Sequence, residues 1–522
     1  MPFPVIFRQC LALGLTAFVA VTGGCYRPGM LRTRVPEVPP FSETGEAQVP
    51  QRWWQAFEDP VLNTQINGAF ASNYTLAAAL QRVYAARALA RREASDLLPD
   101  LDGVVAGQSL FGPGRDRTFV ELGFATDYQL DLWGEIESRV DAERFRADAT
   151  GFDYKALALT LSADIAGTWF SLIEAHAQVE LLEEQIETNR TGLQLQQARF
   201  GLGLIRSADV LRQRQLLEST LEQAVVAGRR IELLEHQLAV LLGQAPQEAS
   251  YDPGSTLPEL PPLPATGLPS ELLHRRPDVR RDYFAFQAAN RDLASAVSAQ
   301  YPRVDLTGSL LSISERPEDL FRNWFATIGG QLIAPLFDGG QRRSEVDRTA
   351  AVASERFNEY AQTMLIALRE VEDALAEERT QRERMTHLRE QVELAGESSV
   401  QLREQYLIGD VEYLDVLSAL TTQQSLQRQL LSAQLELVLI RISLYLALAG
   451  DFEPTPAPWQ EGACDPVALE LNDVQEGDAD SDPRGPTGET PSDADREETN
   501  GLFDELEMLN ELELERLPPP TL

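Results

Sequence analysis

The chain has few of the residues that build disulfide frameworks, metal centres or catalytic sites. It contains only three cysteines and four histidines in 522 residues, and neither type occurs at the short spacings that metal ligands use. No phosphate-binding loop and no grouping of nucleophile, base and orienting residue is visible. We therefore predict a protein that is not an enzyme, with no catalytic residue, no cofactor and no metal.

Positive charge is also scarce. The chain carries 45 Lys and Arg against 81 Asp and Glu, a net charge of −36. Because such a chain repels phosphate backbones and shows no basic stripe, nucleic acid is excluded as a partner. Half of the excess lies after Gly450, where 21 acidic residues face 3 basic ones. Residues 453–522 have the charge and the proline and glycine content of a disordered acidic tail.

Long apolar runs are missing beyond the N-terminus, so we expect no later helix to cross a bilayer. Residues 1–24 have the pattern of a signal peptide, with Arg8 ahead of an apolar stretch. Cys25 follows directly and resembles the lipobox cysteine of bacterial lipoproteins, which implies lipid attachment at Cys25. Tyr26 after it favours the outer membrane. The alternative is an ordinary signal peptide with an incidental cysteine. We expect residues 25–51 to be a lipidated N-terminal segment.

The chain is internally duplicated, with a period of about 205 residues that is far longer than the repeats of solenoids or propellers. The stretches "RFGLGLIRSADVL" and "QYLIGDVEYLDVL" match at five positions that share one offset of 206 residues. Upstream, Pro99 matches Pro302 and Gly134 matches Gly339. The prolines between the halves favour an extended connector. The predicted domains are a first repeat, a proline-rich linker and a second repeat: 52–256, 257–267 and 268–452.

Each repeat begins with an alanine-rich helix, and two strand-like segments follow it. The predicted helices are Leu76–Asp96 and Val279–Gln300, and the predicted strands are Leu101–Phe111, Phe119–Leu130, Val304–Ile313 and Trp324–Ala334. The third strand alternates between apolar and polar residues, with Asp305, Thr307 and Ser309 on its polar face. Strands of roughly 9 to 11 residues can span a bilayer. We predict that Asp305, Thr307 and Ser309 face a barrel lumen; a soluble antiparallel sheet shows the same alternation.

After each predicted hairpin, about sixty residues run without proline, from Glu135 to Gln197 and from Gln341 to Arg403. A helix of that length would reach about 90 Å at ~1.5 Å per residue. The second helix carries a heptad seam, which consists of Met385, Leu388, Val392, Ala395, Ser399, Leu402 and Tyr406. A turn at Gly203 or Gly409 precedes a returning helix of about 35 to 40 residues. The sequence of each repeat therefore predicts a long helical hairpin.

Two β-hairpins give four strands, and four strands cannot close a barrel. In lipid, each open edge would leave backbone amides and carbonyls unpaired, so closure requires strands of other copies. Three copies give twelve strands and room for water, whereas the interior of an eight-stranded barrel is filled by side chains. The predicted fold class is an α+β membrane protein: a homotrimeric twelve-stranded transmembrane β-barrel, four strands per chain, that continues into a long periplasmic α-helical coiled-coil barrel.

Four motifs carry a resemblance to a known family: "WWQAFEDPVLNTQI", "YQLDLWGEI", "LPSELLHRRPDVR" and "PLFDGGQRR". Across about 52–452 the chain resembles the outer membrane efflux proteins typified by TolC, and specifically their efflux lipoprotein branch. The resemblance implies a channel subunit of a tripartite efflux system, a passive exit duct for small molecules in the outer membrane with a large periplasmic part. The implied partners are a periplasmic adaptor protein and an inner-membrane pump of the resistance-nodulation-division type, besides outer-membrane lipid.

The resemblance also implies site residues. The family closes its periplasmic end by polar contacts near the turn of the second hairpin, and Tyr406, Gly409 and Asp415 match that pattern. Tyr406 and Asp415 are therefore predicted gate residues, and Gly203 and Gly409 are predicted adaptor-docking tips. Asp415 has the alternative of a helix cap or a solvated surface residue. Both glycines form turns in either case.

Two alternative functions stay open: an outer-membrane duct of a protein secretion system, and a structural periplasmic coiled-coil lipoprotein. The second alternative leaves both predicted β-hairpins without a role. The lipobox and the "RRPDVR" sequence favour small-molecule efflux over secretion. Trp53, Trp54 and Phe57 are expected to form a packing anchor at the start of the first repeat.

Overall fold

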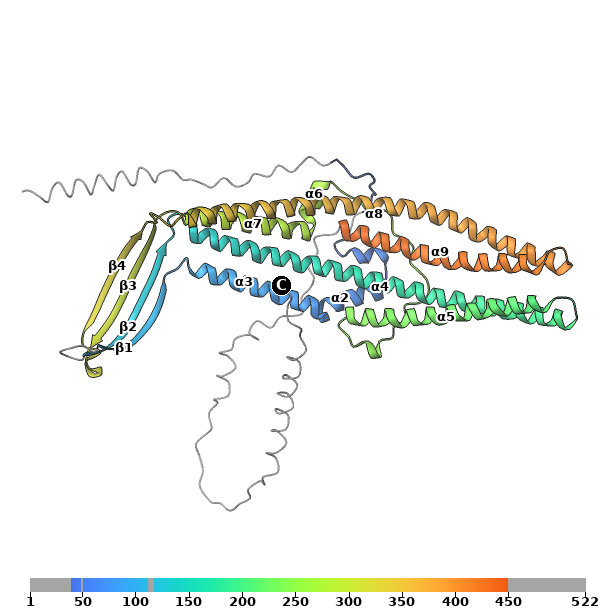
Figure 1. Ribbon diagram of the computed structural model, residues 1–522, viewed down its shortest axis with the longest axis horizontal. Coiled ribbons are helices and arrows are strands. Elements are labelled where there is room, and N and C mark those ends of the chain that lie inside the picture. Colours follow the sequence, from blue (N-terminus) through green and yellow to red (C-terminus); the bar gives the residue numbers. More distant parts are fainter. Residues whose placement is uncertain (1–38, 48–49, 111–116, 449–522) are drawn as a thin grey trace, which may run out of the picture. The chain divides into compact units, whose positions relative to one another are not determined.

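A computed structural model describes residues 39–47, 50–110 and 117–448 (Figure 1). The predicted signal peptide, Cys25 and the acidic tail lie outside the described residues. The helices in chain order are η1 Trp53–Phe57, α2 Pro60–Ser72, α3 Tyr74–Ser95, α4 Glu135–Gly201, α5 Ser207–Leu241, η2 Pro246–Glu248, α6 Pro269–Arg275, α7 Pro277–Ser298, η3 Pro317–Asp319, α8 Gln341–Ile408 and α9 Tyr413–Leu448, and the strands are β1 Asp100–Leu110, β2 Arg117–Leu130, β3 Arg303–Ser314 and β4 Trp324–Ile333. The predicted order of helix, two strands and helical hairpin occurs twice.

The four strands form one antiparallel sheet in the order β1-β2-β3-β4. The sequence predicted every strand bound to within two residues, because turn residues and prolines end the alternating segments sharply. The central pairing of β2 with β3, which runs from Leu130↔Val304 to Val120↔Ser314, joins the two repeats. In the described part of the chain, β1 pairs only with β2 and β4 pairs only with β3, so these strands are the edges of the sheet (Figure 1).

The register gathers apolar side chains on one face of the sheet, because directly opposed residues point to the same side. Along β3, Leu306 and Leu310 alternate with Thr307 and Ser309, as predicted. The apolar face is exposed in the single chain, and its large side chains include Leu101, Val105, Phe124, Leu306, Leu310, Ile328 and Leu332. An exposed apolar face of this extent needs lipid or protein to cover it.

Two very long helices dominate the rest of the chain. The helices α4 and α8 have 67 and 68 residues, which corresponds to roughly 100 Å at ~1.5 Å per residue. The returning helices α5 and α9 have 35 and 36 residues, within the predicted range. Each residue of the predicted heptad seam is buried or half-buried, which confirms the seam. The N-cap of α8 is Gly340 rather than Gly339, so the two caps Gly134 and Gly340 share the offset of 206 residues that the tip motifs show.

The predicted aromatic anchor lies in the main hydrophobic core. Trp53 and Trp54 are fully buried, and the Trp53 indole donates to Ser162 Oγ at 3.0 Å. The Trp53 ring stacks on Tyr445 of α9 with a centroid separation of 5.9 Å. Since this cluster also includes residues of α2, α3, α4 and α5, it ties the first residues of the repeat to both helical hairpins.

The linker between the repeats runs beside the start of the described chain. Ala47 and Pro264 form an isolated parallel bridge. The Gly45 amide donates to the Pro264 carbonyl at 3.0 Å, and the Ala265 amide donates to the Ala47 carbonyl at 2.7 Å. The extended conformation predicted for the prolines therefore supplies a strand-like partner for the segment that leads from the N-terminus.

A buried ion pair holds this linker against α8 and α9. Arg441 is fully buried and donates through Nε to Glu378 at 2.9 Å and through Nη1 to the Pro261 carbonyl at 2.6 Å. Burial alone would raise the pKa of Glu378, but the hydrogen bond and charge of Arg441 outweigh it, and the pKa is lowered. Arg382 adds a second guanidinium to the same carboxylate at 2.8 Å.

Two of the described helices, α4 and α9, are long and apolar enough to cross a membrane by length and composition. The apolar windows of these helices are 61% and 44% buried inside the chain. Both windows lie in helices that supply the main core. Polar residues interrupt the apolar ones in both windows, so neither helix contains a long uninterrupted apolar run.

Candidate functional site

The polar face of the sheet is the first candidate site. The register places Asp127 opposite Thr307, and Gln129 opposite Asp305. Ser309 lies opposite Thr327 on β4. The three predicted lumen residues of β3 therefore share one face with polar residues of β2 and β4. The sheet brings them together because its side chains alternate with a period of two.

Asp305 is less accessible than the sequence suggested. Only 8% of its surface is exposed, because two long neighbours cover it. The Arg303 guanidinium lies 3.4 Å from its carboxylate, and the Gln331 amide donates to it at 3.3 Å. Thr307 is exposed and Ser309 is half-buried. Asp305 is thus a paired carboxylate at the end of the sheet next to the helices.

The helical tips are the second candidate site, and both turns are built around a glycine. Gly203 and Gly409 have φ values of +73° and +86°, a conformation that side chains disfavour. At each tip, two backbone amides return to carbonyls of the last helical turn. Gly409 donates to Tyr406 at 3.1 Å and Asp410 donates to Gln405 at 2.9 Å. No heavy atom lies within 4 Å of a Cβ built at either glycine. The glycines are therefore required for backbone conformation rather than for close packing.

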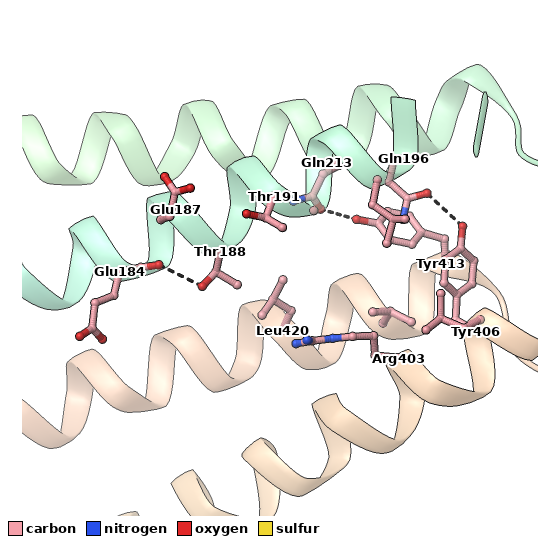
Figure 2. A pocket seen from close by; sticks show the side chains of 14 residues that line it. Glu184, Glu187, Thr188, Thr191, Gln196, Gln213, Arg403, Tyr406, Tyr413 and Leu420 are labelled. Carbon is pink, nitrogen blue, oxygen red and sulfur yellow. Dashed lines mark hydrogen bonds between the residues drawn. The ribbon is translucent and has the colours of Figure 1, made fainter. Parts of the chain in front are cut away.

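Tyr406 links the two helical hairpins near these tips. Its side chain is 7% exposed, and its hydroxyl donates to Gln196 Oε1 of α4 at 3.0 Å. The Arg199 guanidinium lies 4.6 Å from the centre of the Tyr406 ring, a favourable cation–π geometry. Figure 2 shows Gln196 and the tyrosine side chains on facing helices. The single hydroxyl thus connects α8 to α4.

Tyr413 makes a second connection between the same two helical hairpins, from α9 to α5. Its hydroxyl donates to Gln213 Oε1 of α5, and the Gln213 amide donates onward to the Asn189 carbonyl at 2.8 Å. The rings of Tyr406 and Tyr413 lie 5.3 Å apart. Burial raises the pKa of Tyr413, so its hydroxyl stays a donor. Together the two tyrosine–glutamine contacts form a latch beside a groove of about 570 Å³ (Figure 2).

Asp415 does not join this latch. It is exposed in the first turn of α9, and it lines a different groove with Ala395 of α8 and Ser418 of α9. Tyr406 instead lines the groove toward α4 and α5. The two predicted gate residues therefore lie on different sides of the α8–α9 hairpin. The position of Asp415 fits a solvated carboxylate near a helix N-terminus, which the helix dipole favours.

A polar seam continues the contact between the hairpins away from the tips. Asn189 of α4 donates to Thr220 Oγ1 at 2.9 Å and accepts from Gln424 of α9 at 3.1 Å. The Gln185 amide donates to the Gln424 carbonyl at 3.3 Å. All four side chains are buried. An interface that relies on exchangeable amide hydrogen bonds separates at less cost than an apolar one, since water can replace the partners.

The glutamine partners of the two tyrosines were not predicted from the sequence. Gln196 and Gln213 are buried, yet glutamine is a common helix-surface residue, and composition does not mark it as functional. The available signal was positional, because both lie on the inward side of long helices where apolar residues are expected. Among the described residues, no group of three or more His, Cys, Asp or Glu could hold a metal ion.

Comparisons with known proteins agree with this architecture. Residues 66–244 and 268–450 match the family model of the outer membrane efflux protein. The chain is 27% identical over 425 residues to the pyoverdine export outer membrane protein OpmQ of Pseudomonas aeruginosa, covering 78% of this chain and 88% of that protein. It is 29% identical over 407 residues to the solvent efflux pump outer membrane protein SrpC of Pseudomonas putida, covering 76% and 86%.

A solved structure shares the fold. The outer-membrane channel OprN matches with a TM-score of 0.77 and 26% identity, over 80% of this chain and 98% of that chain. The predicted fold class is therefore confirmed: four strands per chain and long helical hairpins, as in the trimeric TolC-like channels with their helical barrel. The family is one of channels rather than of enzymes. The chain belongs to the outer membrane efflux protein family and is an outer-membrane channel subunit of a tripartite efflux system.

Proposed function

We propose that three copies of this chain form a passive exit duct for small molecules across the outer membrane. The observation that carries this proposal is the four-stranded sheet at the end of the long helices. It has an exposed apolar face, a polar face and two edge strands. An open sheet of this kind is costly in lipid unless other copies complete it. Three copies place Asp305, Thr307 and Ser309 around the lumen.

Cys25 anchors the duct to the membrane through lipid. The proposal rests on the signal-like segment before Cys25. Lipid contributes about 0.8 kcal/mol per buried methylene, so several acyl chains give a long-lived anchor. Replacement of Cys25 by serine is expected to abolish labelling of the protein by an alkyne analogue of palmitate. Undiminished labelling of the Cys25→Ser protein would show that the anchor is elsewhere.

The tyrosine–glutamine latch closes the periplasmic end. Tyr406 and Tyr413 hold the α8–α9 hairpin against α4 and α5, and the polar seam beyond them lets the hairpins separate at modest cost. Asp415, exposed on the other side of α9, contributes negative potential, and three copies form an acidic ring that favours cations. An Asp415→Asn channel with unchanged cation preference would remove Asp415 from this role.

The glycine tips dock a periplasmic adaptor, which couples the duct to an inner-membrane pump of the resistance-nodulation-division type. Gly203 and Gly409 leave open space around the tips, so a partner can approach the backbone closely. The names of the relatives support small-molecule cargo, since OpmQ exports pyoverdine and SrpC belongs to a solvent efflux pump. Bulky replacements at both glycines are expected to reduce adaptor crosslinking while the trimer persists.

The decisive experiment measures accumulation of a fluorescent dye and of several drugs in a strain that lacks the gene. Restoring the wild-type chain is expected to lower accumulation, and restoring a chain without β1 and β2 is expected to leave it high. The chain without β1 and β2 is the matched control because it keeps both helical hairpins. Equal accumulation with and without the wild-type chain would contradict the function.

A further inference from the structure

Where β2 of the first repeat pairs with β3 of the second, an aromatic contact joins the two repeats of one chain. The equivalent residues at the two edges of the sheet have no such contact within the described part of the chain. Within the chain, Trp133 follows β2 and covers the end of α7. Its indole donates to the Pro302 carbonyl at 2.7 Å and its ring stacks on Tyr301 at 5.1 Å. The Ser298 hydroxyl donates to the Trp133 carbonyl at 2.9 Å. This contact seals the corner where β2 and β3 pair.

The second copy of this junction lacks its partner. By the repeat, Phe337 after β4 takes the place of Trp133, and Leu98 in the turn between α3 and β1 takes the place of Tyr301. Phe337 is 92% exposed and Leu98 is 69% exposed in the single chain. The edges β4 and β1 lie on opposite sides of the sheet (Figure 1), so one chain cannot bring these two residues together.

We infer that Phe337 seats on Leu98 and Pro99 of a second copy of this chain, and that β4 pairs with β1 of that copy in the register that Ala334↔Leu101 sets. The register follows from transferring the pairing of Leu130 with Val304 through the repeat. The inference rests on the proposed trimer and names the surface that closes it. Under this register the apolar face is continuous, and its opposed residues are Leu332 with Gly103, Gly330 with Val105, and Ile328 with Gly107.

The size of the opposed side chains supports this register independently. Within the chain, the apolar-face glycines lie opposite larger residues, in the pairs Gly103–Phe124, Gly107–Val120, Gly308–Ile328 and Gly330–Leu306. The inferred seam continues that alternation of large and small. A slip of two residues in either direction would place Gly330 opposite Gly103 or Gly107. A slip of one residue would turn the polar positions of β1 toward lipid.

Cysteine crosslinking in membranes tests the register. In a Cys464→Ser background, Gln331→Cys is combined with Val104→Cys, its inferred partner on the polar face. The matched slip variants combine Gln331→Cys with Asp102→Cys or with Ala106→Cys. Oxidation is expected to produce a covalent trimer with Val104→Cys and to lose it with the slip partners, because directly opposed Cβ atoms lie about 5 Å apart and diagonal ones about 7 Å.

An intrachain pair calibrates the reaction. Ala125 and Ser309 are opposed within one chain, so the double cysteine variant is expected to oxidise without any covalent oligomer. A trimer crosslinked through a slip partner, or a trimer that crosslinks through none of the three, overturns the register. The same variants are also tested for restored efflux in the strain that lacks the gene, which distinguishes a failure of the register from a failure of the proposed function. A shifted crosslink with restored efflux leaves the function intact, whereas a monomeric wild-type chain contradicts the trimer itself.

The Phe337 seat has its own test in the heat-dissociation temperature of the trimer on detergent gels. Phe337→Ala is expected to lower this temperature. Phe337→Trp is expected to raise it, because the indole supplies the donor that Trp133 already directs at Pro302 and would direct it at Pro99 of the neighbouring copy. Opposite shifts from the two variants separate a specific seat from general loss of apolar surface. Unchanged temperatures for both variants overturn the seat.

Discussion

Removing one hydroxyl of the latch should open the duct. Tyr406→Phe keeps the ring and its contact with Tyr413 but removes the donor to Gln196, a residue that is only 2% exposed. A buried hydrogen bond of this kind contributes about 1 kcal/mol. If three chains open together, the closed state loses about 3 kcal/mol, which shifts the equilibrium toward the open state by about 100-fold. Water replaces the lost partner only in the open state.

Single-channel recording in planar bilayers measures this shift as the open probability at low voltage. Tyr413→Phe should act in the same direction through Gln213, and the double variant should exceed either single one. Tyr283→Phe on α7, away from the tips, is the matched control and should leave the open probability unchanged. If Tyr406→Phe channels with wild-type helicity open no more often than wild type, the latch does not hold the duct closed.

Other expectations concern stability. Arg441→Ala should destabilise the chain by about 3 to 5 kcal/mol, because it leaves Glu378 buried without its main partner. The midpoint temperature of thermal unfolding should rise again when Glu378 is also replaced by Met. Since the pKa of Glu378 is lowered in the folded chain, the ion pair should contribute fully above the unfolded pKa near 4.5 and lose its contribution as pH falls through the folded pKa, which pH-dependent unfolding measures. Gly409→Ala should cost about 1 kcal/mol for its left-handed backbone, whereas Gly228→Ala inside α5 should stabilise by a similar amount, as denaturant midpoints would show.

Much of this architecture could be predicted from local patterns. Strand bounds followed from the period-two alternation of residues such as Leu306 and Thr307, and helix extents followed from the absence of proline. The duplicated motifs predicted that Gly203 and Gly409 would occupy equivalent turns, and the structure has both in the left-handed conformation. These features depend on residues that are close in sequence, and one amino-acid sequence is therefore enough to predict them.

The site was less predictable. Tyr406 was predicted to be a gate residue near the tip, but its partner Gln196 lies 210 positions away, and only its position on the inward side of α4 marks it. Asp415 was grouped with Tyr406 because both match the pattern by which the family closes its periplasmic end. They point into different grooves because the helix turn at Gly409 and the start of α9 rotate them apart.

The sequence by itself determined which segments are helix or strand, which face of each strand is apolar, and that the chain is two copies of one unit. Those properties follow from side-chain periodicity and from the backbone preferences of glycine and proline. Only the tertiary structure decided which buried polar groups meet, as in the contacts Tyr406–Gln196 and Arg441–Glu378. Such pairs depend on the relative rotation and axial offset of helices distant in sequence, which periodicity leaves free until the helices pack.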